Sequence, residues 1–205
     1  MLLVRLFAPL LVAWCVSSSA FAQKRVVVFV GMPGAGKSTV ADALAQRLAV
    51  KRWTSGDVIR ETIKARGLPY TPENDRAVAL EFAARPGEIG RRVAAGVAAE
   101  PGRVAVIEGF RNLSDLQELR KAYPDLLVVS VEVGAARRYA RMLKRGRAGE
   151  NNLAFLRARD RRELQTGVRQ VMRTADIHIR PRADDPRGLE RSLQRRLGRF
   201  MSLEP

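Results

Sequence analysis

Apolar residues occur along the chain in short runs, separated by longer segments of mixed character. Such runs are typical of strands buried on both faces of a parallel sheet. The predicted strands are Val26–Val30, Val104–Ile107, Leu126–Val133 and Ala175–Ile179. After the first run, Val40, Leu44 and Leu48 recur every four residues, which gives a helix one face to bury. The pattern predicts an α/β fold of three layers, with helices around a mostly parallel five-stranded sheet.

The first predicted strand leads directly into a glycine-rich segment. Its residues are Gly31, Met32, Pro33, Gly34, Ala35, Gly36, Lys37, Ser38 and Thr39. They fit the pattern G-x-x-x-x-G-K-[ST], with a strand before it and a helix after it. The glycines allow close backbone approach, so that N–H groups and the helix N-terminus face an anion. Lys37 is predicted to reach the β- and γ-phosphates and Ser38 to ligate Mg²⁺, so the segment predicts a P-loop that binds ATP and Mg²⁺.

The strand Val104–Ile107 ends in a carboxylate, Glu108, followed by Arg111. Ligands of open α/β sheets bind at the C-terminal edge of the strands. Glu108 is therefore predicted to order Mg²⁺ or to accept a proton from an acceptor molecule. Arg111 is predicted to contact the acceptor or the transferred phosphate. The alternative for Glu108 is an ordinary residue at a strand end.

A second motif follows the P-loop helix, at Thr54-Ser55-Gly56-Asp57-Val58-Ile59-Arg60. It resembles the S/T-G-D-x-x-R segment of adenylate kinases and related nucleoside monophosphate kinases. The resemblance implies that Arg60 binds the phosphate of the acceptor and that Asp57 lies near Mg²⁺. Equally, Ser55 or Asp57 could cap a helix, with Arg60 in solvent. The mostly helical region 67–102 has the position of the small acceptor-binding insertion of such kinases.

A predicted helix over Ala135–Lys144 is followed by a glycine-punctuated break at Arg145–Asn152 and a second arginine-rich helix. In kinases of this type, a short lid with this layout brings arginines onto the phosphates and excludes water. The candidates are Arg145, Arg147, Arg159 and Arg162. The alternative is that several of them are simply exposed helix charges.

Together, these motifs closely resemble a subgroup of P-loop kinases, the adenylate-kinase-like proteins often labelled dephospho-CoA-kinase-related. The resemblance runs from Val26 to about Arg182, and Phe110 departs from it by replacing a smaller apolar residue. It implies ATP- and Mg²⁺-dependent phosphoryl transfer to a small phosphorylated acceptor, such as a nucleoside monophosphate. The residues implied in catalysis are Lys37, Glu108, Arg111 and the lid arginines; Asp57, Arg60 and Arg111 bind substrate, and Ser38, Asp57 and Glu108 serve the metal.

Charge complicates this interpretation. The formal net charge is +16, and 31 of the 37 basic residues are Arg. Such a surface could attract nucleic acid, an anionic membrane or phosphorylated substrates, although a coding bias toward Arg would also produce it. An ATPase or nucleotide sensor that acts with nucleic acid is therefore one alternative function, and a nucleotide-binding relic without efficient turnover is a second. Aromatic residues make up only 6%, which argues against a base-stacking surface.

The N-terminal segment 1–22 has the features of a secretory signal. Arg5 precedes the apolar run Leu6–Val16, and Ala20-Phe21-Ala22 resembles a cleavage site. The run is too short to span a bilayer. Because ATP is scarce outside the cytoplasm, the alternative is a start codon assigned too far upstream. We expect a cytoplasmic kinase domain at 23–205, with export as the other possibility. Cys15 and His178 are the only residues of their types, which argues against disulfides and against His- or Cys-based catalysis.

Overall fold

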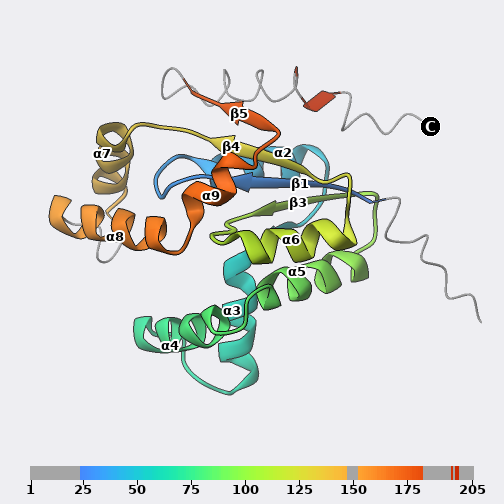
Figure 1. The fold of residues 1–205 in the computed structure, drawn as a ribbon, viewed down its shortest axis with the longest axis horizontal. Helices are drawn as coiled ribbons and strands as arrows, with labels where there is room; N and C mark the ends of the chain where they lie inside the picture. The colour runs from blue at the N-terminus through green and yellow to red at the C-terminus, as the bar shows by residue number, and fades with distance from the viewer. Residues whose placement is uncertain (1–23, 147–151, 182–194, 196, 199–205) are drawn as a thin grey trace, which may run out of the picture.

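The computed structural model describes residues 24–146, 152–181, 195 and 197–198, so the signal-like segment 1–22 lies outside it. Five strands form the central sheet: β1 (Arg25–Val30), β2 (Arg52–Thr54), β3 (Val104–Glu108), β4 (Leu127–Val131) and β5 (Ile177–Ile179). They lie in the order β2-β3-β1-β4-β5, and every neighbouring pair is parallel (Figure 1). The predicted α/β fold with a five-stranded parallel sheet is confirmed.

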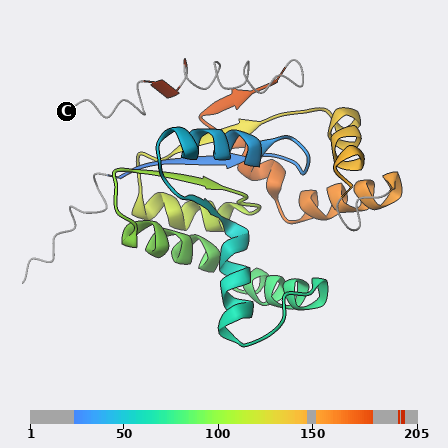
Figure 2. The same ribbon diagram turned by 180° about the vertical axis from the view of Figure 1, so that it is seen from behind.

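Helices cover both faces of the sheet. The helices are α2 (Lys37–Arg47), α3 (Ser55–Ala65), α4 (Pro72–Ala83), α5 (Glu88–Ala99), α6 (Leu113–Ala122), α7 (Ala135–Arg145), α8 (Leu153–Gln165) and α9 (Val168–Arg173). Side chains alternate along β1, so that Val27 and Phe29 pack with α2 in one core, while Val26, Val28 and Val30 pack on the opposite face. That second core includes residues of α3, α5, α6 and α9. Figure 2 shows α2 in front of the sheet, on the face that Figure 1 hides.

The strand β2 is not predicted by the apolar pattern. It is three residues long and has only Trp53 buried, between the half-buried Arg52 and Thr54. An edge strand this short gives almost no periodicity to detect, and only its pairing with β3 defines it. The other strands agree with the prediction within a few residues, and the segment Leu126–Val133 forms the shorter strand β4.

The helical region 67–102, which was predicted to be an acceptor-binding insertion, divides into two parts. Helix α5 packs against α6 beside the sheet, where the backbone of Gly90 approaches Asp115 so closely that a Cβ would lie 2.0 Å from the carbonyl oxygen. Only α4 and the end of α3 project away from the sheet as an arm (Figure 1). The projecting part of the predicted insertion is therefore smaller than the region 67–102.

Candidate nucleotide and acceptor site

The loop after β1 has the backbone of an anion cradle. Gly31 has a φ of 149°, and a Cβ there would lie 2.5 Å from the carbonyl oxygen of Val131. Gly34, at a φ of 76°, would bring a Cβ within 2.9 Å of Met142. Gly36, in the left-handed region, is the N-cap of α2, and no side chain among the described residues caps that N-terminus. The first N–H groups of α2 are thus left for a phosphate, which fits a nucleotide.

Lys37 extends along this loop. Its Nζ donates a hydrogen bond to the carbonyl oxygen of Met32, at 3.1 Å. Burial lowers the pKa of Lys37 to about 8, although the charges of Glu108 and Glu163 raise it in part. The ammonium therefore lies in a confined site where a bound anion would favour its charged form.

Glu108 faces the start of α2 from the end of β3. Its carboxylate accepts a hydrogen bond from Ser38 Oγ at 2.9 Å, and the side chain is mostly buried. Arg52 binds the second oxygen of the same carboxylate and also binds Asp42. Ser38 and Glu108 offer adjacent oxygen atoms of the type that Mg²⁺ prefers. Their position fits the metal role predicted for both residues.

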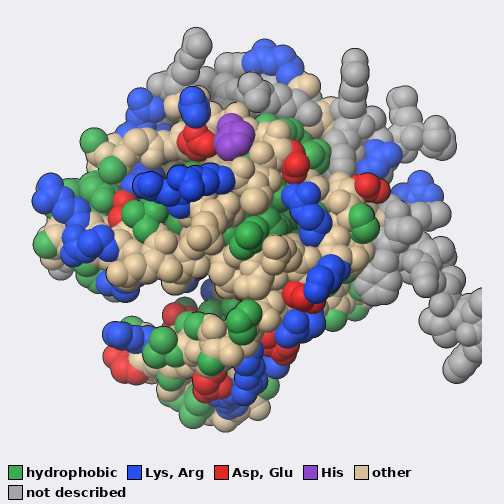
Figure 3. Space-filling view, in the orientation of Figure 1, with side chains coloured by type: hydrophobic (Ala, Val, Ile, Leu, Met, Phe, Trp, Pro, Cys, Tyr) green, Lys and Arg blue, Asp and Glu red, His purple; other side chains and the backbone are tan. Residues whose placement is uncertain are grey.

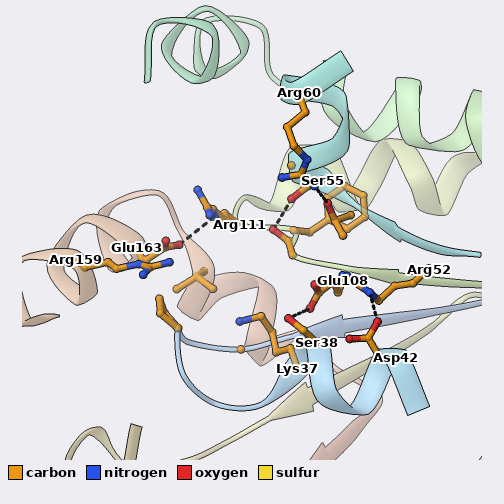
Figure 4. Close-up of a pocket in the computed structure, with 17 residues that line it drawn as sticks. Lys37, Ser38, Asp42, Arg52, Ser55, Arg60, Glu108, Arg111, Arg159 and Glu163 are labelled. Carbon is orange, nitrogen blue, oxygen red and sulfur yellow. Dashed lines mark hydrogen bonds and ion pairs between the residues drawn. The ribbon is translucent and has the colours of Figure 1, made fainter. Parts of the chain in front are cut away.

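These groups line a pocket of about 420 Å³. The residues that line it are Gly31, Pro33, Lys37, Ser38, Asp42, Arg52, Thr54, Ser55, Gly56, Arg60, Glu108, Gly109, Phe110, Arg111, Arg159, Glu163 and Val168. Figure 4 shows the loop residues on one side of the pocket, with Arg60, Arg111 and Arg159 across from them. The surface is hollowed between the α3–α4 arm and α8, the helices that supply Arg60 and Arg159 (Figure 3). The pocket therefore brings together a phosphate loop and a second, arginine-lined end.

At this second end, Arg111 forms an ion pair with Glu163 of α8, at 3.2 Å. Arg111 is more than half exposed, whereas Glu163 is buried. Arg159 of the same helix also lines the pocket. The structure thus places Arg111, which was predicted from the end of β3, in the same pocket as Arg159, one of the four predicted lid arginines.

Asp57 has a different position from the one that the metal prediction requires. It is not among the pocket-lining residues, and its carboxylate accepts hydrogen bonds from Thr54 N and Arg60. Thr54 Oγ1 accepts from Asp57 N, which completes a capping box at the start of α3. Burial by itself would raise the pKa of Asp57. The hydrogen bonds with Arg60 and Thr54 together lower the pKa by more than burial raises it, so it lies below the ordinary value. The geometry favours the capping alternative for Asp57, with Thr54 as the N-cap, and leaves Arg60 at the pocket.

Two other lid candidates, Arg145 and Arg162, are not among the residues that line the pocket. Arg145 is the exposed last residue of α7. Arg162 lies over the ring of Phe155, with 5.8 Å between its guanidinium carbon and the ring centre. Arg147 lies outside the described residues. For these three arginines, a role on the phosphates stays a prediction.

A buried arginine connects the P-loop to α7 and α8. Arg138 donates to the carbonyl oxygens of Pro33, at 2.9 Å, and Val133, at 3.1 Å, and it forms an ion pair with Asp160. Tyr139 Oη donates to the same carboxylate at 2.8 Å. This network fixes α8, which carries Arg159 and Glu163, relative to the phosphate loop.

Sequence reasoning missed Asp42, Arg52 and Glu163 as pocket residues. Asp42 lies four residues after Ser38, so the helical repeat would have placed it one turn further along the same side of α2. Glu163 lies four residues after Arg159 and could have been found in the same way. No local signal identifies Arg52, because its position depends on the pairing of β2 with β3.

Within the described part of the chain, no three His, Cys, Asp or Glu side chains cluster in a way that could hold a metal ion. No helix in that part is long and apolar enough to cross a membrane.

Comparisons with known proteins match this architecture. Residues 30–154 match the model of a family described as an AAA domain. A UPF0200 protein of Aeropyrum pernix is 33% identical over 160 residues, which cover 77% of this chain and 84% of the relative. A UPF0200 protein of Pyrococcus abyssi is also 33% identical, over 75% of this chain and 86% of the relative. These relatives support the family, and they do not identify the dephospho-CoA-kinase-related subgroup.

Solved structures share the fold at low sequence identity. A shikimate kinase from Acinetobacter baumannii, in complex with shikimate, superposes with a TM-score of 0.60 at 17% identity, covering 91% of this chain and all of that one. A gluconokinase from Sinorhizobium meliloti gives a TM-score of 0.53 at 19% identity, over 87% and 94% of the two chains. The chain has the fold of these P-loop kinases, and it belongs to the AAA-domain family whose model it matches and to the UPF0200 proteins.

Proposed function

We propose that this protein transfers the γ-phosphoryl group of ATP, with Mg²⁺, to a small phosphorylated acceptor, and that a nucleoside monophosphate is the first candidate. The observation that carries the proposal is the two-ended pocket. One end has the phosphate loop with Lys37 and Ser38, and the other has Arg60 and Arg111. Transfer to an anionic acceptor needs a second anion site beside the phosphate loop, whereas simple nucleotide binding does not.

The donor end positions the triphosphate. The bare N-terminus of α2 and Lys37 neutralise its charge, and Ser38 and Glu108 hold the metal. When bound, Mg²⁺ supplies positive charge to the transferring phosphoryl. Phosphoryl transfer depends mainly on positioning and charge, so these side chains need form no covalent intermediate.

The acceptor end binds an anion. The planar guanidinium groups of Arg60 and Arg111 match the oxygens of a phosphate or a carboxylate. If the acceptor reacts through a hydroxyl, Glu108 is the buried carboxylate that lines the pocket and can take its proton. If the acceptor reacts through a phosphate oxygen, no such base is required, and Glu108 serves the metal alone.

The test is ADP release by the purified chain with ATP, Mg²⁺ and a panel of acceptors. The panel contains nucleoside monophosphates, dephospho-CoA, and the hydroxy acids shikimate and gluconate. Stimulation by one phosphorylated acceptor that disappears in Lys37→Ala supports the proposal, whereas stimulation by shikimate or gluconate alone would keep the transfer and replace the proposed acceptor class. Arg111→Ala should then raise the KM for that acceptor, while Arg157→Ala, a change at an exposed arginine of α8 that is not among the pocket-lining residues, should not. ATP binding without stimulation by any acceptor contradicts it.

Net charge favours one alternative function, a P-loop ATPase or nucleotide sensor that acts with nucleic acid. Stimulation of ADP release by RNA or DNA, and by no small acceptor, would identify it. Because either activity consumes ATP, we place the protein in the cytoplasm, which fractionation of cells that express the full chain would test.

A further inference from the structure

Arg52 binds two carboxylates that line the pocket, and neither of them belongs to the P-loop motif. Its Nε donates to Asp42 Oδ1 at 2.6 Å, and its terminal nitrogen NH1 donates to Glu108 Oε1. Ser38 Oγ donates to the other oxygen of Glu108, Oε2, at 2.9 Å. The two oxygens of Glu108 therefore have different partners, one from β2 and one from α2.

The register of the sheet brings these side chains together. Arg52 pairs with Val106, and Thr54 pairs with Glu108, so Arg52 lies two residues away from the position opposite Glu108. Residues two apart in a strand share a face, and Val106 belongs to the core on the α2 face. Arg52 consequently points toward α2, where Asp42 lies one helical turn after Ser38.

This arrangement limits the orientation of Glu108. The exposed fraction of its side chain is 10%, and that of Arg52 is 28%, so water competes little for the bond between them. With one oxygen held by Arg52, the carboxylate presents the other to Ser38. A serine hydroxyl that donates its proton to Glu108 keeps its lone pairs for a hard cation.

We propose that Arg52 is a positioning residue, which holds Glu108, and through it the Ser38 hydroxyl, in the orientation that receives the Mg²⁺ of a metal–nucleotide complex. This inference rests on the metal–nucleotide binding of the proposed function, and it does not depend on the acceptor. Asp42 has a supporting part, since it fixes the guanidinium from the opposite side.

Two simpler roles for Arg52 predict different effects on nucleotide binding from those of a positioning role. A structural link between β2 and α2 would affect nucleotide binding equally with and without metal. A purely electrostatic role would depend on the positive charge alone, so Arg52→Lys would preserve it. A positioning role needs the planar guanidinium, which binds two partners at once, and a lysine ammonium does not reproduce this geometry.

The experiment measures the Kd of a fluorescent ATP analogue in Mg²⁺ and in EDTA, for the full chain. The ratio of the two constants gives the benefit of the metal. In Arg52→Lys we expect this benefit to fall about tenfold, the lower end of the effect found for residues that orient metal ligands. The Kd in EDTA should stay within about twofold, because the phosphate loop itself is unchanged. Asp42→Asn should reduce the benefit less.

The matched control is Arg91→Lys. Arg91 also bridges two carboxylates, Glu88 and Glu118, but it is not among the pocket-lining residues. In Arg91→Lys, the ratio of the Kd in EDTA to the Kd in Mg²⁺ should equal that of the wild type. The proposal is overturned if Arg52→Lys keeps the wild-type benefit, or if both of its constants weaken equally. Failure of every acceptor to stimulate turnover would instead remove the proposed transfer and leave this inference standing, whereas a wild type that binds no nucleotide removes both.

Discussion

At the scale of single residues, the buried ammonium of Lys37 destabilises the folded protein when no nucleotide is bound. Burial lowers its pKa from an ordinary 10.5 to about 8. Below pH 8 the lysine is charged in both the folded and the unfolded chain, so the folded state bears the full desolvation penalty. As the pH rises from 8 to 10.5, the folded protein holds Lys37 neutral while the unfolded chain still binds a proton, and the penalty disappears.

We therefore expect Lys37→Met to be more thermostable than the wild type at pH 7, by a few degrees. The difference in Tm should shrink between pH 8 and pH 10. Comparing the two proteins at each pH removes the contribution of groups that they share. A difference that stays constant over this range would show that Lys37 is not desolvated.

Residue roles were predictable where they depend on neighbouring sequence. The positions of Lys37 and Ser38 follow from an unbroken motif between a strand and a helix, and Glu108 follows from its place at a strand end. The roles of Arg52 and Glu163 depend instead on which distant carboxylate or guanidinium each one meets. Asp57 shows the same difficulty, because a segment that resembles a substrate site also satisfies the rules of a capping box.

At the scale of elements, the network of Arg138 and Asp160 fixes α7 and α8 against the P-loop. Removing one charge leaves the other buried without compensation, which typically costs about 3–5 kcal/mol. Asp160→Asn should therefore lower the free energy of unfolding by about that amount in urea titrations. Nucleotide affinity should fall as well, since Arg138 also holds the carbonyl oxygen of Pro33.

Glu81→Gln is the control for this prediction. It breaks the surface ion pair between Arg66 and Glu81, in which both side chains are about 40% exposed. Such exposed pairs contribute little to stability, because water and salt screen the two charges. Equal losses in the two variants would mean that the Arg138–Asp160 pair is not protected from solvent.

The contact between α5 and α6 depends on one glycine. A Cβ at Gly90 would lie 2.0 Å from the carbonyl oxygen of Asp115, and the backbone of Asp115 in α6 leaves it no room. Gly90→Ala should destabilise the protein by about 1–3 kcal/mol, although alanine favours a helix in itself. Gly56→Ala in α3 is the comparison, because its Cβ would meet the flexible end of Arg60, at 3.1 Å, and otherwise Thr54 Oγ1 at an ordinary contact distance of 3.5 Å. Urea unfolding of both variants tests this, and a stabilised Gly90→Ala would contradict it.

The sequence predicted the strands and helices that have a clear apolar pattern of their own, and it missed those that depend on contacts with distant segments. The strand β3 is buried along its whole length and β1 everywhere except at Arg25, so their apolar runs identify them. The pattern of β2 is too short, and the division of the region 67–102 into α4 on the arm and α5 on the sheet depends on the packing of Gly90 against α6.

At the scale of the whole molecule, positive charge is concentrated where acidic residues are withdrawn from the surface. Along α8 and α9, the acidic residues Asp160 and Glu163 are buried, while exposed arginines follow one another. Five arginines are exposed there: Arg162, which lies over the ring of Phe155, and the four residues Arg157, Arg161, Arg169 and Arg173. Basic side chains are visible on the face that carries these two helices (Figure 3). This surface can attract polyanions without involving the P-loop.

We therefore expect non-specific binding of duplex DNA with a steep salt dependence. For four neutralised phosphates, affinity should fall about 100-fold between 50 and 200 mM salt. Changing the four arginines to Gln should reduce the slope by about 0.9 for each phosphate that is no longer neutralised, while Lys37→Ala should keep the wild-type slope. If the fourfold variant also retains acceptor-stimulated ADP release, DNA binding and phosphoryl transfer are separate properties. If the variant instead loses a DNA-stimulated hydrolysis that the wild type has, the net charge serves the activity, and the nucleic-acid-linked ATPase replaces the small-molecule kinase.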